Sequence, residues 1–196
     1  MIRWIVCLLI WTSTATAQSL PERYSVTGVA GDDVLNIRSG PAASFDKIGE
    51  FGPYTLNVEV LRIEDGWGMV PAGERNGWVS MRFLEAYPIP ANEVPRPLVC
   101  SGTEPFWTLA LYPRGSEYNS PDTGRRDLEI MRELAADKGF LIQAREGLTL
   151  ERTIVVNALP CNDGMSDRVF GMTATLFNDT PEGSSVQNGC CTFQSN

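Results

Sequence analysis

Four prolines within one short stretch, Pro88, Pro90, Pro95 and Pro97, limit what this chain can fold into. Proline fixes φ near about −65° and removes a backbone donor, so this spacing favours an extended, semi-rigid backbone and opposes helix. We therefore place a linker at residues 88–98, between a domain at 22–87 and a second domain at 99–193. The 196 residues suffice for one ordinary domain or two small ones.

Short alternating runs separated by turn residues fill the first domain. Residues 34–38 alternate in polarity and stop at a Ser-Gly-Pro turn, and residues 56–61 alternate before the hairpin-type dipeptide Asp65-Gly66. So many short strands in one small domain predict a barrel, because closure removes exposed strand edges. The expected strands include residues 34–38, 56–61, 67–70 and 77–79, with a loop at 71–76.

The same segment carries a series of motifs in a fixed order. LNIRSGP at 35–41 is followed by IG at 48–49, DGW at 65–67, GWV at 77–79 and FL at 83–84. Over nearly all of residues 24–87 this series resembles the bacterial SH3-like domain family. The resemblance implies a small barrel that attaches to cell-wall peptide stems or to protein partners. The chain departs from the family pattern around 51–55 and in the loop at 71–76.

Three short blocks mark the second domain: CSGTEPFWTL at 100–109, CNDGMSD at 161–167 and GCC at 189–191. Together they resemble a family of small exported bacterial proteins of unknown function, marked by G-x-E-P-F-W, C-x-D-x-M-S-D and a terminal G-C. The resemblance implies an all-β domain and supplies no activity. The whole chain is therefore predicted to be all-β: a small SH3-like barrel followed by a second, disulfide-stabilised, mainly antiparallel β domain.

Residues 127–137 (DLEIMRELAAD) allow two interpretations. Their apolar residues would share one face of a helix, and good helix formers occur throughout. However, the DKG sequence at 137–139 is typical of a hairpin turn into the apolar run that follows. The family resemblance favours two strands, so we expect strand, turn and strand here.

Four cysteines lie in the second domain: Cys100, Cys161, Cys190 and Cys191. An even number in an exported chain favours disulfides, and a ring between adjacent cysteines is strained. We favour Cys161–Cys190 with Cys100–Cys191, and the swapped pairing remains open. On the chain-entropy account, a loop of about 30 residues adds roughly 3–4 kcal/mol. A Cys-only metal site is less favoured because no C-x-x-C pair occurs.

The first residues have the pattern of an export signal. Arg3 precedes an apolar run at 4–11, and Ala15-Thr16-Ala17 is an A-x-A cleavage pattern, so residues 1–17 are predicted to be removed after Ala17. The run is too short to span a bilayer, which needs roughly 20 apolar residues. We expect a periplasmic or secreted protein that does not span the membrane.

Charge and composition exclude several function classes. The formal net charge is −8, without a basic patch in the sequence, so binding to nucleic acid is not expected. The chain contains no histidine. Zinc hydrolase sites, Ser-His-Asp triads and Cys-His dyads all depend on imidazole, whose pKa lies near neutral pH. We therefore expect neither catalysis nor a metal or cofactor.

Aromatic residues of the first domain are the first candidate site. Tyr54, Trp67 and Trp78 are predicted to line a groove for peptide or glycan, with Asn36 and Arg38 as polar contacts. The alternative, which we favour for each tryptophan, is a core position, because a small domain buries little surface and needs large side chains. Asn36 and Arg38 would then set a turn and a surface ion pair.

Glu104, Asp163, Ser166 and Asp167 form the second candidate site. Paired carboxylates can act as acid and base where burial separates their pKa values, and desolvation beside Phe106-Trp107 would raise the pKa of Glu104. We favour a structural interpretation, in which Asp163 and Ser166 accept backbone N–H bonds in a tight turn. Phe106-Trp107 would then pack the core behind the disulfide.

Together these features predict a monomeric, non-catalytic binding protein or adaptor of the cell envelope. Its partner would be cell-wall peptide, recognised by the SH3-like domain, or an envelope protein. One alternative is an inhibitor or modulator of an envelope enzyme, in which Glu104 or the turn at Asp163 enters the active site of that enzyme. The other is a carboxylate-based hydrolase.

Overall fold

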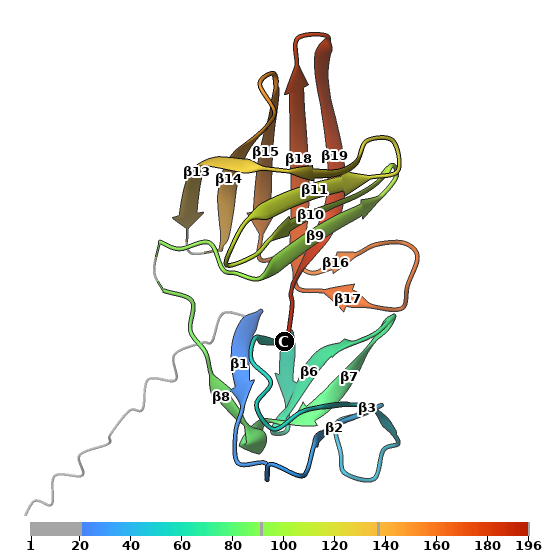
Figure 1. Cartoon of the computed structure of the whole chain (residues 1–196). Helices are drawn as coiled ribbons and strands as arrows, with labels where there is room; N and C mark the ends of the chain where they lie inside the picture. Colours follow the sequence, from blue (N-terminus) through green and yellow to red (C-terminus); the bar gives the residue numbers. More distant parts are fainter. Residues whose placement is uncertain (1–20, 91, 137, 196) are drawn as a thin grey trace, which may run out of the picture.

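The computed structural model describes residues 21–90, 92–136 and 138–195, and it stacks two β domains end to end (Figure 1). Within these ranges every regular element is a strand, except for the 3-10 turn η1 (Met81–Phe83). The predicted all-β class is confirmed. The expected export signal at residues 1–17 lies outside the described residues. No helix in the described part of the chain has the length and apolar character that crossing a membrane requires.

The first domain is a small barrel made of two antiparallel sheets. One sheet has the order β4-β1-β8 and the other the order β3-β2-β7-β6-β5. Strand alternation places Ile37, Val70 and Val79 on the inner face, where they are at most 4% exposed and join one apolar core. The strands are β1 (Glu22–Val26), β2 (Leu35–Arg38), β3 (Lys47–Phe51), β4 (Val58–Val60), β5 (Arg62–Glu64), β6 (Trp67–Ala72), β7 (Arg75–Ser80) and β8 (Leu84–Ala86).

Two expectations for this domain are wrong in detail. The six-residue loop at 71–76 does not form, because β6 continues to Ala72 and β7 starts at Arg75. Gly73 has a φ of 68°, which allows the tight hairpin turn between these strands. The strand expected at 56–61 begins only at Val58, since Asn57 adopts a φ of 57°.

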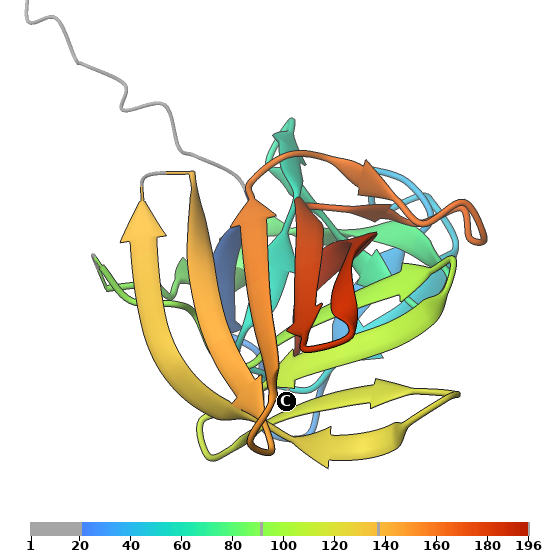
Figure 2. The same ribbon diagram turned by 90° about the horizontal axis from the view of Figure 1, so that it is seen from above.

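The second domain is one nine-stranded antiparallel sheet that curls around its own core, as seen from above in Figure 2. The order is β12-β11-β10-β9-β19-β18-β15-β14-β13, and a short hairpin of β16 and β17 stands beside it. The strands are β9 (Leu98–Thr103), β10 (Phe106–Leu111), β11 (Ser116–Ser120), β12 (Gly124–Asp127), β13 (Glu129–Ala136), β14 (Gly139–Glu146), β15 (Leu150–Asn157), β16 (Cys161–Asn162), β17 (Val169–Phe170), β18 (Met172–Thr180) and β19 (Gly183–Phe193).

Residues 129–136 and 139–146 form the two strands β13 and β14, as the sequence predicted, rather than a helix. The helical face is not used because β13 pairs with β14 from Glu129 to Ala136, with one irregularity between Ile130 and Arg132, and so extends the sheet. The disulfides join Cys100 to Cys191 and Cys161 to Cys190, which is the pairing favoured from the sequence. The first bond connects neighbouring strands β9 and β19, and the second fastens the β16–β17 hairpin to β19.

A buried polar network closes the curled sheet. Arg152 of β15 is 4% exposed, and it donates to Glu146 Oε2 from Nε at 3.0 Å and from Nη2 at 2.5 Å. It also donates to Asn178 Oδ1, and its guanidinium carbon lies 3.5 Å from the centroid of the Tyr118 ring on β11. Arg126 of β12 reaches Glu146 from the far end of the strand order, at 3.7 Å. The network therefore ties the β11–β12 end of the sheet to β14 and β15.

Candidate functional site

A row of side chains crosses the outer face of the five-stranded sheet in the first domain. In register, Arg62 of β5 lies opposite Met69, Met69 opposite Trp78, Trp78 opposite Arg38, and Arg38 opposite Lys47 of β3. Directly opposed residues of an antiparallel sheet share one face. We call these five residues the outer row.

The outer row faces away from the core. Its neighbours along the strands, Ile37, Val70 and Val79, are the residues that fill the barrel interior. Alternation therefore turns Arg38, Met69 and Trp78 outward. Trp78 is nevertheless only 7% exposed, and it is not part of the core cluster. Neither sequence interpretation describes this position fully, because the indole is buried on the outer face and not inside the barrel.

Positive charge gathers around this indole, although the chain as a whole is acidic. The Arg62 guanidinium lies 5.1 Å from the centroid of the Trp78 ring. Arg62 is paired with Glu64 at 3.3 Å, and Lys47 with Glu50 at 2.6 Å. Arg38 donates from Nη1 to the Phe45 carbonyl at 2.8 Å and forms no ion pair with any described residue. Its charge is therefore available to an anionic ligand.

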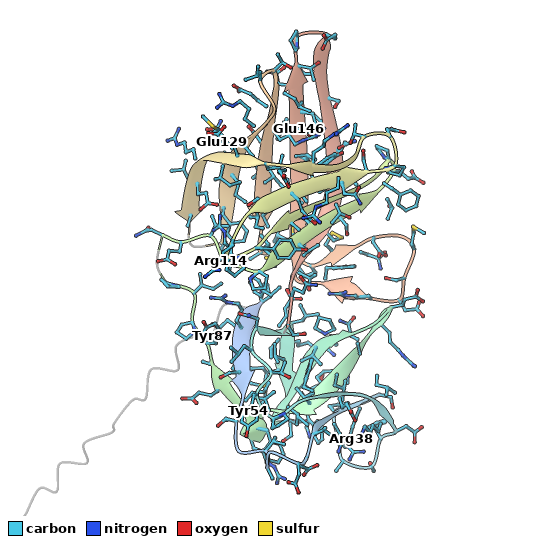
Figure 3. All side chains as sticks on the ribbon, in the orientation of Figure 1. Arg38, Tyr54, Tyr87, Arg114, Glu129 and Glu146 are labelled. Atoms are coloured by element: carbon cyan, nitrogen blue, oxygen red, sulfur yellow. A yellow bond between two sulfur atoms is a disulfide. The ribbon has the colours of Figure 1, made fainter. Side chains whose placement is uncertain are left out.

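The other predicted residues of this site are only partly brought together. Trp67 lies opposite Ser80, and Trp78 is two residues from Ser80, so the two tryptophans are diagonal neighbours on the outer face. Asn36 lies two residues before Arg38 in β2 and therefore shares this face with it. Tyr54 is 78% exposed and stands apart from Arg38 in Figure 3, with its hydroxyl beside Gly31. Tyr54 therefore belongs to a different part of the barrel surface.

The three sequence blocks of the second domain meet around Trp107, which is 2% exposed. A Cβ on Gly102 would lie 2.2 Å from Trp107 Nε1, and a Cβ on Gly189 would lie 2.8 Å from Trp107 Cζ2. Thr103 Oγ1 donates to the Asp163 carbonyl at 3.1 Å, which connects the second block. The two glycines of the first and third blocks thus make room for the indole, so this constellation supports the fold.

The carboxylates of the second candidate site also have structural surroundings. Asp163 Oδ1 accepts from the N–H of Met165 at 3.0 Å and from the N–H of Ser166 at 2.9 Å. The hydrogen bond from the Met165 backbone, followed by those from Ser166, lowers the pKa of Asp163 and keeps it ionised. Glu104 and Asp167 are exposed, so the expected desolvation of Glu104 does not occur.

The sequence interpretation of Phe106 is wrong, because this side chain does not pack the core with Trp107. Phe106 is 53% exposed, since alternation along β10 turns it outward when Trp107 points inward. It lines a recess of about 450 Å³ on the outer face of β9 to β11, together with Ser101, Thr103 and Asn119. Among the described residues, no group of three or more Cys, Asp or Glu is placed to hold a metal ion.

A buried carboxyl group joins the two domains, and no motif or pattern in the sequence indicated it. Glu59 of β4 is 2% exposed and accepts from Thr192 Oγ1 at 2.5 Å and from the Phe193 N–H at 3.5 Å. Arg168 donates to the same Thr192 hydroxyl at 2.7 Å. Burial raises the pKa of Glu59 to about 7, against the lowering effects of the Thr192 hydrogen bond and the Arg168 charge.

Sequence reasoning also missed Lys47 and Arg62 as members of the outer row. Both are exposed charged residues of short strands, and only the strand register places them in one row with Trp78. The arrangement suits an extended ligand that carries carboxylates, because the indole offers apolar area while the guanidinium and ammonium groups offer donors.

Comparison with known proteins gives one distant match. A protein of Bacillus subtilis (strain 168), named "Putative N-acetylmuramoyl-L-alanine amidase YrvJ", is 32% identical over 81 residues, which are 41% of this chain and 15% of that protein. The chain therefore spans only a small part of the relative's length. No protein-family model matches the chain, and no solved structure matches it.

Proposed function

We propose that this protein is a non-catalytic binding protein of the cell envelope, located in the periplasm or secreted. Its first domain, an SH3-like domain, recognises the acidic peptide of the cell wall through the outer row. The observation that carries this proposal is Arg38, a cation without a carboxylate partner among the described residues, placed opposite Trp78 on the sheet. Stem peptides of the wall carry free carboxylates, which guanidinium groups bind well.

Three other observations support the proposal. The similarity to the amidase relative covers a segment of this chain and a small fraction of that enzyme, as expected for an accessory module shared between proteins. Two disulfides suit an oxidising compartment outside the cytoplasm. The chain has no histidine to act as a base near neutral pH. Asp163 is held ionised by backbone N–H donors, which lower its pKa and make it a weak base.

Binding to purified cell-wall sacculi tests the proposal. The mature chain should co-sediment with sacculi, and Arg38→Glu should weaken this binding by about tenfold or more, because it removes a charge-assisted contact and adds a repulsion. Arg114→Glu is the matched control, since Arg114 is an exposed arginine of the other domain and lies far from Arg38 in Figure 3. It should bind as the wild type does.

Two results would contradict the proposal. One is equal binding by the Arg38→Glu and Arg114→Glu proteins when both have wild-type circular dichroism spectra. The other is release of soluble wall fragments by the purified protein, which would show catalysis. The wild type should release no fragments above a protein-free control.

A further inference from the structure

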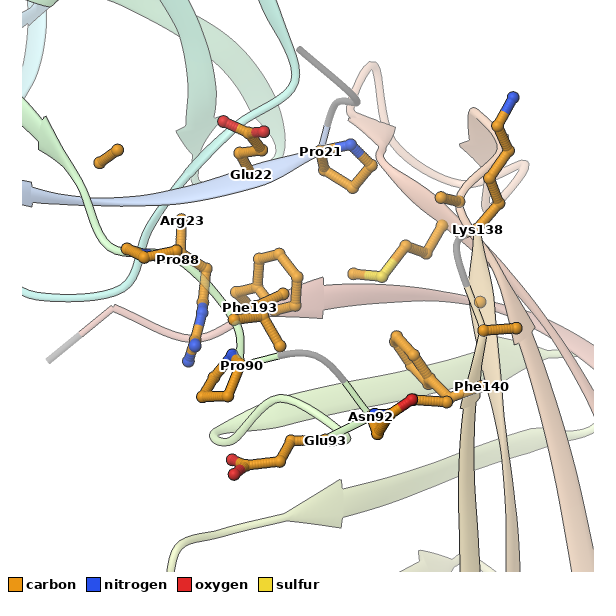
Figure 4. Close-up of a pocket in the computed structure, with 17 residues that line it drawn as sticks. Pro21, Glu22, Arg23, Pro88, Pro90, Asn92, Glu93, Lys138, Phe140 and Phe193 are labelled. Carbon is orange, nitrogen blue, oxygen red and sulfur yellow. The ribbon is translucent and has the colours of Figure 1, made fainter.

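A cleft of about 680 Å³ lies between the two domains, on surfaces that the proposed peptide site does not use. Strand β1 and the linker form one wall with the end of β19, and the β13–β14 hairpin forms the other. In Figure 4, Phe193 on the first wall faces Phe140 on the second, the Arg23 guanidinium lies beside Phe193 and Pro90, and the Lys138 side chain extends away from Arg23. This volume lies within the usual range of small-molecule sites, about 300–1,000 Å³.

Arg23 is the unusual group in this cleft. Its side chain is 7% exposed, and Nη1 donates to Asn57 Oδ1 at 3.2 Å and to the Arg96 carbonyl at 3.1 Å. Its Nε is buried and has no hydrogen-bond acceptor. Burial lowers the pKa of Arg23, which shows that its charge is poorly solvated. A buried guanidinium normally has an anionic partner, because an unpaired buried charge is strongly destabilising.

No carboxylate of the described residues fills that role. Glu22 and Glu93 line the same cleft, and the charge of Glu93 raises the pKa of Arg23 from a distance. Within the described ranges Arg23 has hydrogen bonds to an amide oxygen and a backbone carbonyl and no carboxylate in an ion pair. The nearest groups around the guanidinium are aromatic, since its central carbon lies 5.0 Å from the Tyr87 ring centroid and 5.8 Å from that of Phe193. Because Nε is closed off by burial and Nη1 already has two acceptors, the donor left for an anion in the cleft is Nη2, which has no acceptor among the described residues.

The rest of the cleft is mainly apolar. Pro88, Pro90, Phe140, Met172 and Phe193 all contribute to its lining, and Lys138 adds a second cation at the exposed end of the hairpin. A ligand that fits must combine a single carboxylate with an apolar part. A phosphate is a poorer match, because its greater charge would meet two carboxylates and only two cations.

We propose that this interdomain cleft is a second binding site, which takes a short peptide by its free C-terminal carboxylate. Arg23 receives the carboxylate, and the apolar side chains of the peptide lie between Phe140 and Phe193. Because the walls come from both domains, the ligand also holds the domains in their docked arrangement. This site is separate from the outer row and does not depend on the function proposed for it.

Calorimetric titration of the whole mature protein tests this site. The probes are N-acetyl-leucyl-alanine with a free carboxylate and the same dipeptide with a C-terminal amide. The acid should bind, and the amide should bind at least about tenfold more weakly, which corresponds to about 1.4 kcal/mol. Arg23→Gln should remove this preference for the acid.

Because Arg23 also holds Asn57 and the linker, a second variant separates binding from folding. Ala136→Trp places a large side chain in the cleft at an exposed alanine of its lining, and it should abolish binding of the acid. Ala43→Trp, at an exposed alanine outside the cleft, is the control and should bind within twofold of the wild type.

Four results would overturn the inference. The wild type could fail to bind the acid at millimolar concentration, or bind acid and amide equally. The Ala136→Trp protein could bind the acid as the wild type does. Finally, the wild type could bind inorganic phosphate more tightly than the dipeptide acid.

Discussion

The buried carboxyl group of Glu59 gives the most informative single perturbation of this fold. Its pKa is raised from 4.5 to about 7 because burial between the domains disfavours the charged form. In the unfolded chain the same group ionises near its ordinary value. Between these two values the folded protein holds a proton that the unfolded protein has lost. Glu59 therefore contributes stability below pH 4.5 that is lost as the pH rises through 7.

The size of the effect follows from the shift. Each unit of pKa corresponds to about 1.4 kcal/mol, so a shift from 4.5 to about 7 destabilises the protein by about 3 kcal/mol at pH 8 relative to pH 4. Glu59→Gln keeps the shape of the protonated acid and cannot ionise. The variant should be about 3 kcal/mol more stable than the wild type at pH 8, and within about 0.5 kcal/mol of it at pH 4.5.

Denaturant unfolding followed by tryptophan fluorescence at several pH values measures this difference. Glu85→Gln, which removes an exposed carboxylate from the same domain, is the control and should keep the pH dependence of the wild type. If wild type and Glu59→Gln lose stability in parallel between pH 5 and 8, Glu59 is not protonated in the folded state. The account of the domain junction would then be wrong.

Three further predictions concern the second domain. The oxidised mature protein should show no free thiol under denaturing, non-reducing conditions, and two or more titratable thiols would contradict the disulfide assignment. Gly102→Ala should destabilise the protein by about 1–3 kcal/mol in thermal or denaturant unfolding, because the new Cβ would lie 2.2 Å from the buried Trp107 indole. Gly52→Ala is the control and should have little effect, since its Cβ would lie 3.6 Å from the nearest atom. Arg152→Met should cost about 3–5 kcal/mol, because it removes the buried partner of Glu146 and of Asn178 and leaves Glu146 with only the longer contact to Arg126. Arg125→Met, which breaks a pair with an exposed arginine, should cost under about 1 kcal/mol, and equal costs would contradict the role of the network.

Much of the fold was predictable because local sequence determines it. Alternation located β2, and the Asp65-Gly66 dipeptide marked the turn between β5 and β6. The DKG sequence at 137–139 correctly predicted two strands, β13 and β14, in a segment with helical periodicity. Turn residues act over a few positions, so they can be recognised without knowledge of the rest of the chain. The hairpin between β6 and β7 was predicted less well, since Pro71 is tolerated within a strand there.

The domain junction could not be predicted, because its contacts join residues far apart in sequence. Glu59 lies between two valines in β4, and alternation alone assigns it to the surface. That surface is covered by the second domain, where Thr192 and Phe193 meet the carboxyl group. The interdomain cleft around Arg23 arises in the same way, from docking and not from any motif.

The candidate peptide site could be predicted in part, less completely than the strands and turns but better than the domain junction. Arg38 and Trp78 stood out in the sequence, but the tryptophan could equally have filled the barrel core. The pairing of Arg38 with Trp78, and of Met69 with both Trp78 and Arg62, resolves this by placing the side chains in one row. Register is a property of the folded sheet, so the row becomes visible only in the structure.

The central claim, recognition of acidic wall peptide by the outer row, is tested most directly by nuclear magnetic resonance. A soluble stem peptide is titrated into isotope-labelled mature protein, and changes in the amide signals are mapped onto the strands. The account predicts saturable changes concentrated on β5, β6, β7 and β2, with the largest around Trp78 and Arg38. Changes confined to the second domain, or none at millimolar peptide, would contradict it.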